Sequence, residues 1–324
     1  MRLSLFIYLL LRLPSSAFSQ SDSTILLHFG GDCLMAGHYE RAAGSDPDLA
    51  FRDFDLFHTS DVAMVNLECC VSARGEPVPK PYNFRMRPSY LGALQRAGIT
   101  IVNLANNHIF DYGKEGLFDT IFYLDSSRVG HVGAGMNRNE AHTPHYYEKA
   151  GIKIGFMGYY EGGEAPAATE GEPGVAARTI SAIRADVRRM KERDGADFVI
   201  LSFHWGVEKA DTVEEWQRQF AHRAIRAGAD LIIGHHPHVL QGIERYRGGV
   251  IAYSLGNFIF GGNSRHTYRT AVLEVMLDKS GEEYRLIPVQ VRRWKASVLP
   301  EGEGEEILMR VRTLSEKFSE SIFQ

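Results

Sequence analysis

Seven short runs rich in aliphatic and β-branched residues recur along this sequence, and most of them end in polar residues. They cover residues 25–32, 62–68, 99–108, 153–161, 197–205, 229–236 and 249–260. Runs of this kind are typical of strands buried in a sheet. Helical patterns at 89–98, 114–127, 179–195 and 213–228 lie between several of them. The alternation predicts a layered α/β fold in which helices cover the sheet on both faces.

The polar residues at the ends of five of these runs are all of types that can bind a metal ion or a substrate. They are Asp32, Asn66, Glu68, Asn106, Asn107, His108, His204, His235, His236 and His238. In open α/β sheets, ligands gather at the carboxyl edge of the strands, so we expect these side chains to converge. Imidazole nitrogens with carboxylate and amide oxygens suit Zn, Mn, Fe, Mg or Ca, and they predict a site for one or two divalent ions.

The polar clusters stand in a recognisable set of motifs between about Ile25 and Gly262. These are GGDCLM, VNLECCVS, PYNFRMRP, GITIVNLANNHIFDYG, SFHWGVE, GADLIIGHHPHVLQGIE and AYSLGNFIF. Their order resembles the calcineurin-like metallophosphoesterase superfamily, and more closely its branch of CapA-type poly-γ-glutamate capsule biosynthesis proteins. The resemblance implies a metallophosphatase-like layered sandwich of mixed β-sheets flanked by helices.

The same resemblance implies a role for each residue of the site. The implied metal ligands are Asp32, Glu68 as the bridging carboxylate, Asn107, His204, His236 and His238. His108 is the implied general acid, oriented by Asp111 three residues on. His235 and Asn257 are expected beside the ligands, without binding metal themselves.

Two positions depart from the pattern of the hydrolytic members. Leu34 stands where a second ligand usually follows the first Asp, and Glu68 stands where the bridging acid is usually Asp. We therefore hypothesise one tightly bound ion or an unequal pair, and the resemblance does not by itself imply phosphoester hydrolysis.

Four further residues are interpreted as substrate contacts. Lys80 and Arg85 flank aromatic residues in KPYNFRMRP and suit an anion clamp for a carboxylate-rich or phosphorylated substrate, although a solvated basic loop has the same composition. Asn66 and Glu208 are also expected to face the substrate. The glycine-rich segment 161–174 is interpreted as a flap beside the site.

We assign residues 25–300 to the main domain, with a signal or anchor segment before it and a helix after it that closes the same domain. Residues 1–19 have the layout of a secretory signal peptide or N-terminal anchor, with Arg2, an apolar run and Ala17 before Ser19. We therefore expect export to the periplasm or the extracellular space. A hairpin is predicted at 268–294, and residues 301–324 are assigned to a closing helix, at about 303–319.

Composition excludes some partners and leaves one question on the cysteines open. The net charge is −4 and the basic residues are dispersed, which argues against nucleic acid as a partner. The three cysteines are too few for a disulfide framework; one bridge from Cys33 to Cys69 or Cys70 and buried free thiols remain as alternatives.

The chain as a whole is interpreted as an exported component of poly-γ-glutamate or capsular polymer synthesis that works beside a membrane-bound synthetase. Its metal site would hydrolyse or transfer a phosphorylated or γ-glutamyl group. Two alternatives stay open: a metal-dependent phosphoesterase or amide hydrolase unrelated to capsule, and a non-catalytic partner of the synthetase.

Overall fold

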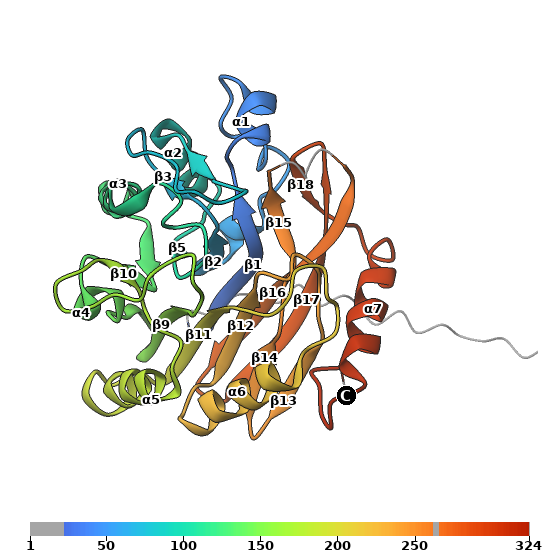
Figure 1. The fold of residues 1–324 in the computed structure, drawn as a ribbon. Helices are drawn as coiled ribbons and strands as arrows, with labels where there is room; N and C mark the ends of the chain where they lie inside the picture. Colours follow the sequence, from blue (N-terminus) through green and yellow to red (C-terminus); the bar gives the residue numbers. More distant parts are fainter. Residues whose placement is uncertain (1–22, 262–265, 324) are drawn as a thin grey trace, which may run out of the picture.

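Two mixed β-sheets pack face to face in the computed structural model, which describes residues 23–261 and 266–323 (Figure 1). The signal or anchor predicted at 1–19 lies outside the described residues. The first sheet has the order β18-β17-β16-β1-β2-β5-β6, with β15 also paired to β1. Its strands are β1 (Ile25–Leu34), β2 (Val62–Leu67), β5 (Ile101–Asn103), β6 (Gly130–Val132), β15 (Asn257–Phe260), β16 (Tyr268–Asp278), β17 (Gly281–Arg292) and β18 (Lys295–Val298).

The second sheet has six strands in the order β13-β14-β12-β11-β9-β8. They are β8 (His145–Lys149), β9 (Ile152–Tyr160), β11 (Phe198–His204), β12 (Leu231–His235), β13 (Ile243–Tyr246) and β14 (Gly249–Ala252). Two small pairs complete the strands, β3 (Cys70–Val71) with β4 (Arg85–Met86) and β7 (Ala134–Gly135) with β10 (Gly174–Val175).

The core between the two sheets is formed by their facing aliphatic side chains. Leu27 and Phe29 of β1 lie in one apolar cluster with Ile200 of β11 and Ile233 of β12. Both faces of these central strands are buried, which explains why they read in the sequence as continuous apolar runs.

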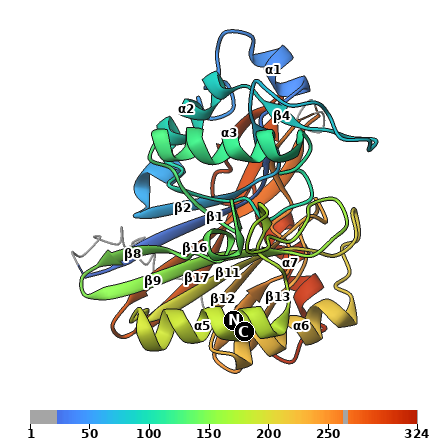
Figure 2. The same ribbon diagram turned by 60° about the vertical axis from the view of Figure 1, so that its left-hand side comes forward.

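Helices cover the outer face of each sheet, as Figure 2 shows with α3 above the sheets and α5 and α6 below. On the first sheet, α2 and α3 pack over β2 and β5; on the second, α5 and α6 pack over β11 and β12. The helices are α1 (His38–Ala43), α2 (Pro88–Arg96), α3 (Gly113–Ser126), α4 (Arg138–Ala141), α5 (Ile180–Arg188), α6 (Glu215–Arg226) and α7 (Glu305–Ser315), with a 3₁₀ turn at Leu56–Thr59 and a π turn at Arg189–Arg193. The predicted layered sandwich of mixed sheets flanked by helices is confirmed.

The local sequence explains where several of these helices begin. Pro88 occupies the first turn of α2, where its missing N–H removes no helical hydrogen bond. The Thr179 side chain accepts a hydrogen bond at the start of α5, and Glu214 with Gln217 forms a reciprocal capping box at the start of α6.

One predicted strand, residues 249–260, is in fact two strands in different sheets. β14 pairs with β12 of the second sheet, whereas β15 pairs with β1 of the first. The chain crosses between the sheets in the intervening turn, where Gly256 has a φ of 65°. The prediction of one continuous strand was wrong, because pattern alone does not reveal which sheet a strand joins. The hairpin at 268–294 is confirmed as β16 and β17, and α7 lies within the range expected for the closing helix.

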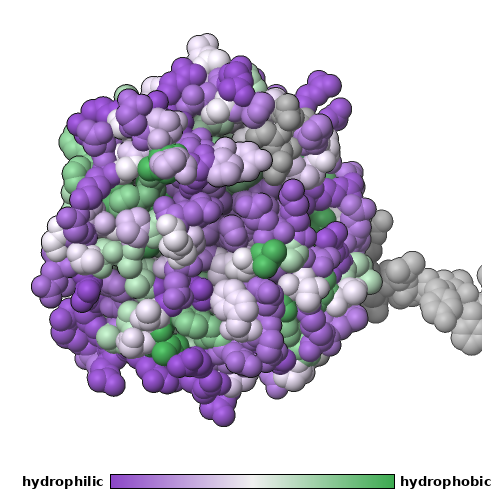
Figure 3. Space-filling model, in the orientation of Figure 1, coloured by the Kyte–Doolittle hydropathy of each residue, from purple (hydrophilic) through white to green (hydrophobic). Residues whose placement is uncertain are grey.

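The three cysteines are free and buried, so the bridge left open above is not formed. Within the described residues, no helix combines the length and the apolar character that a membrane span requires. Hydrophilic residues cover most of the face shown in Figure 3, where apolar residues appear as small separate patches.

Candidate metal centre

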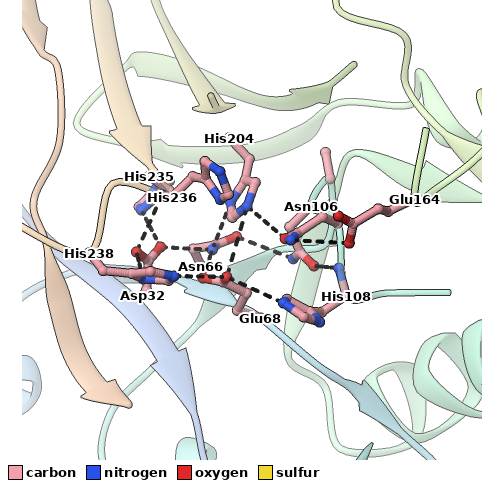
Figure 4. Close-up of polar contacts among 12 residues, drawn as sticks. Asp32, Asn66, Glu68, Asn106, His108, Glu164, His204, His235, His236 and His238 are labelled. Atoms are coloured by element: carbon pink, nitrogen blue, oxygen red, sulfur yellow. Dashed lines mark hydrogen bonds and ion pairs between the residues drawn. The ribbon is translucent and has the colours of Figure 1, made fainter. Parts of the chain in front are cut away.

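The carboxyl ends of strands from both sheets meet at one place and bring the predicted ligands together (Figure 4). In the first sheet Asp32 lies in register with Asn66, and in the second His204 lies in register with His235. Contacts between the sheets then join the two sets, including one from Asp32 to His238. The convergence predicted from the strand ends is confirmed.

Asp32 lies at the end of the central strand β1 and is completely buried. Its Oδ1 accepts a hydrogen bond from Asn66 Nδ2 at 2.9 Å, and its Oδ2 accepts from His238 Nδ1 at 3.0 Å. Burial alone would raise the pKa of Asp32, but the contacts with His235 and His238 outweigh it and hold that pKa well below its ordinary value. The carboxylate is therefore ionised and available as a metal ligand.

The backbone before Asp32 requires glycine, which the sequence supplies in FGGD. A Cβ on Gly31 would lie 2.0 Å from the carbonyl oxygen of Gly256. That same carbonyl accepts the Asp32 N–H at 2.8 Å. Gly31 thus permits the close approach of β1 to the 254–256 turn, which fixes the position of Asp32.

Glu68 stands at the centre of the cluster and is also completely buried. Its Oε2 accepts a hydrogen bond from Asn66, but its Oε1 has no hydrogen-bond partner. Three imidazoles face that oxygen, with Nε2 of His238 at 3.6 Å, of His204 at 3.9 Å and of His108 at 4.0 Å.

The charges around Glu68 call for a cation. Burial, and next the charge of Asp32, raise the pKa of Glu68 well above its ordinary value. Two buried carboxyl groups side by side are stable together only when one of them is protonated or when a positive charge compensates both. The unpartnered oxygen and the imidazole nitrogens around it fit a divalent ion bound between them.

Asn107 and His204 form the other side of this arrangement. The side-chain oxygen of Asn107 lies 2.8 Å from His204 Nε2, and the other ring nitrogen, Nδ1, lies 3.3 Å from Asn66 Nδ2. Burial, followed by the neighbouring His236, lowers the pKa of His204 well below its ordinary value. The ring is therefore neutral at physiological pH, as a metal-binding imidazole must be.

His236 and His238 occupy an unusual backbone conformation, with φ of 94° and 59°. Non-glycine residues at positive φ are strained by ~1–3 kcal/mol each, and such strain is concentrated at functional sites. This backbone conformation directs the side chains of both His236 and His238 toward the cluster. His235, as expected, lies beside the ligands, with Nδ1 3.5 Å from Asp32.

The residues fit one or two cations that share Glu68. Three groups of possible ligand atoms lie within 4.8 Å of one another: Asp32 with Glu68 and His238, Glu68 with His204 and His236, and Glu208 with His236 and His238. Glu208 is exposed, so it joins the cluster from the solvent side, where a substrate could also reach it. Leu34 is buried, and its aliphatic side chain has no atom that can bind a metal, so this position adds no ligand.

Asn66 lies inside the site rather than at its surface, and its role as a substrate contact stays a prediction. It is completely buried and lies beneath the two acids, donating to both. Its side-chain oxygen accepts from Asn103 Nδ2 at 2.9 Å and from Asn106 Nδ2 at 3.3 Å. The structural role of Asn103 was missed, although an amide inside an apolar strand was a signal for it.

His108 and Asp111 form the predicted pair. His108 Nδ1 donates to Asp111 Oδ2 at 2.7 Å, which leaves Nε2 facing Glu68. The Lys80 ammonium lies 2.5 Å from Asp111 Oδ1 and 2.9 Å from Glu164 Oε2. Lys80 is thus at the edge of the site, as predicted, but acids of this chain already hold it. Glu164, in the predicted flap, was not identified from the sequence.

Arg85 and Asn257 differ in how they relate to the cluster. The Arg85 guanidinium donates to the carbonyls of Arg74 and Gly75 and stacks 4.0 Å above the Tyr112 ring, so the structure does not bring it into the cluster. Asn257 lies opposite Asp32 on β15, and its buried side-chain oxygen has no partner.

A cleft of about 770 Å³ adjoins the cluster and gives room for a substrate. Its lining includes His238, Asn257, Arg269 and, from α7, Arg310. Another cleft, of about 810 Å³, is lined by none of the predicted site residues. Of these two clefts, the one beside His238 is therefore the one that adjoins the cluster.

Comparison with known proteins identifies the family. The model of the bacterial capsule synthesis protein PGA_cap matches residues 26–262. The PGA biosynthesis protein CapA of Bacillus subtilis (strain 168) is 30% identical over 308 residues, covering 92% of this chain and 80% of that protein. The capsule biosynthesis protein CapA of Bacillus anthracis is 31% identical over 260 residues, covering 78% of this chain and 63% of that protein, so the chain spans less than two thirds of it.

A third relative and one solved structure complete the comparison. The Mycobacterium tuberculosis (strain ATCC 25618 / H37Rv) protein named "Probable polyglutamine synthesis accessory protein" is 31% identical over 281 residues, covering 80% of this chain and 73% of that protein. The crystal structure of a hypothetical protein from Thermus thermophilus matches with a TM-score of 0.51 at 15% identity, over 82% of this chain and 98% of that chain, and supports the fold alone. The resemblance drawn from the motifs is confirmed: this chain belongs to the bacterial capsule synthesis protein family PGA_cap.

Proposed function

We propose that this chain is an exported component of poly-γ-glutamate or related capsular polymer synthesis, and that it hydrolyses or transfers a γ-glutamyl or phosphorylated group at a divalent metal site. The observation that carries the proposal is the unpartnered Oε1 of Glu68, buried among the imidazoles of His108, His204 and His238. The names of the relatives support the biological process, and the ligand set supports the chemistry.

Asp32, Glu68 and the imidazoles would hold a divalent ion. Such an ion would polarise a substrate oxygen and lower the pKa of a water molecule, so that hydroxide is available near neutral pH. The chain itself orients the ligands, because Asn66 fixes both carboxylates from below. His108 supplies the proton for the leaving group: Asp111 holds Nδ1–H at 2.7 Å, so the Nε2 atom points into the site.

We also propose that the protein works beside a membrane-bound polymer synthetase, to which residues 1–19 bring it as a signal or an anchor. The M. tuberculosis relative is named as an accessory protein of polymer synthesis, which supports such an association. Fractionation of cells that express the chain with and without residues 1–19 tests the export.

The experiment that tests the activity uses two substrates and one pair of variants. The metal-loaded protein is incubated with a γ-glutamyl peptide and with a phosphodiester, beside His108→Gln and, as a control, His58→Gln at an exposed position. Turnover of the peptide that His108→Gln loses and His58→Gln keeps supports the proposal. Turnover of the phosphodiester alone, lost in His108→Gln and kept in His58→Gln, restricts the proposal to a phosphorylated substrate. No turnover of either substrate refutes the proposed activity and leaves the role of a non-catalytic partner.

A further inference from the structure

The Lys80 ammonium has three oxygen partners within the chain. It donates hydrogen bonds to Asn107 O at 2.8 Å and to Glu164 Oε2 at 2.9 Å, and it forms an ion pair with Asp111 Oδ1 at 2.5 Å. The Lys80 side chain is only 12% exposed, and the Asp111 side chain is completely buried. The Asn107 carbonyl and the Asp111 carboxylate therefore belong to the fixed wall of the site.

The third partner of Lys80, Glu164, differs from the other two. The Glu164 side chain is 51% exposed and comes from the loop between β9 and β10, which contributes no predicted metal ligand. Its Oε2 also lies 3.4 Å from Asn107 Nδ2, and the oxygen of the same Asn107 amide faces His204. Figure 4 shows Glu164 reaching the cluster from the side opposite Asp32 and His238. A carboxylate of the chain thus rests directly beside a predicted metal ligand.

We propose that Lys80 and the Asn107 amide form a subsite for a carboxylate of the substrate, and that Glu164 occupies this subsite until the substrate displaces it. The Glu164 end of the ion pair is half exposed and water can solvate its carboxylate, so a competing carboxylate can replace Glu164 at small cost. The buried partner Asp111 keeps the ammonium in place during the exchange.

The subsite narrows the class of substrate that the protein can bind. Binding at the subsite does not depend on the proposed function; only the reaction after binding rests on it. A carboxylate bound there would lie on the Asn107 side of the metal cluster, and the group next to it in the molecule would reach the cluster. Among the proposed substrates, a γ-glutamyl chain carries such a carboxylate beside its amide. The structure therefore favours a glutamyl substrate over a simple phosphoester.

The test measures binding rather than turnover. Calorimetric titration with glutarate, and separately with inorganic phosphate, compares the wild-type protein with Glu164→Ala and with Glu170→Ala, a control on the same loop that is also exposed. Removing the internal competitor should tighten glutarate binding about two- to fivefold, the factor equivalent to one exposed ion pair. Glu170→Ala should bind as the wild type does.

A second variant tests the cation of the subsite. In the Glu164→Ala background, Lys80→Gln should weaken glutarate binding by about tenfold, with a melting temperature that shows the protein is folded. Unchanged or weaker glutarate binding by Glu164→Ala would overturn the proposal, and so would tightening for phosphate but not for glutarate. Glutarate binding that follows the prediction without turnover of any γ-glutamyl peptide would refute the proposed activity and leave the subsite standing.

Discussion

Replacing Glu68 with glutamine would remove the negative charge at the centre of the site and keep the size of the side chain. The glutamine oxygen can still accept the hydrogen bond that Asn66 donates to Glu68 Oε2 at 3.2 Å. The change therefore acts on the charge and on the unpartnered Oε1, and leaves the packing in place. Two opposite effects on stability follow, one without metal and one with it.

Without metal, the variant should be the more stable protein. Burial and the charge of Asp32 raise the pKa of Glu68 above its ordinary value of 4.5, so the folded state holds a proton that the unfolded state releases. The free energy of unfolding of the wild type therefore falls as the pH rises from the ordinary pKa of Glu68 toward its raised pKa, by about 1.4 kcal/mol for each pH unit. Glutamine does not titrate, so the advantage of the variant should grow over this range of pH.

With metal, the order should reverse. A ligand at a hundred times its Kd stabilises the folded state by about 3 kcal/mol, or about 5 °C in Tm for a chain of this length. The variant lacks the carboxylate that two of the three ligand groups share and should lose most of this shift.

Thermal unfolding measures both effects, with chelator and then with added Mn²⁺ or Zn²⁺, from pH 5 to pH 8. Glu283→Gln, at an exposed position of β17, is the control and should follow the wild type. A full metal-dependent shift in the Tm of Glu68→Gln would refute the role of Glu68 as a ligand. A metal-free variant that melts several degrees below the metal-free wild type would refute the raised pKa of Glu68.

Three further predictions follow from the site and the core. His108→Gln should lower kcat by about 10²- to 10⁴-fold without changing the bound metal, measured by turnover and elemental analysis; loss of the metal would contradict its role as a proton donor. Burial raises the pKa of Cys33 and Cys70 to about 12, so the thiols should react with an alkylating reagent only after unfolding; rapid labelling of the native protein would be inconsistent with this. Asn66→Leu should cost about 3 kcal/mol in urea unfolding, because both acids lose a donor; a cost near zero would show that Asn66 does not hold them.

The architecture and most of the metal cluster could be predicted from the sequence because both depend on local patterns. Apolar runs and helical periodicity located the strands and the main helices. Parallel strands place their carboxyl ends at a common edge, so Asp32, Glu68 and His204 could be expected together although they are far apart in the chain.

The contacts around the cluster could not be predicted in the same way, because they depend on pairings between distant segments. Lys80 and Glu164 are 84 residues apart, and nothing local to either reveals the other. Asn66 is a plausible substrate contact in the sequence, but its position beneath the acids depends on the packing of β5 beside β2. The division of residues 249–260 between two sheets likewise depends on which strands are already paired.

Metal stoichiometry tests the central claim most directly. The metal-free protein is titrated with Zn²⁺ and with Mn²⁺ beside a His236→Ala, His238→Ala double variant, and bound metal is measured by elemental analysis. We expect one tightly bound ion or an unequal pair in the wild type, and loss of the tight ion in the variant. Equal metal binding by the two proteins, or none by either, would contradict the metal centre, and two equivalent tight sites would contradict the unequal binding inferred from Leu34 and Glu68.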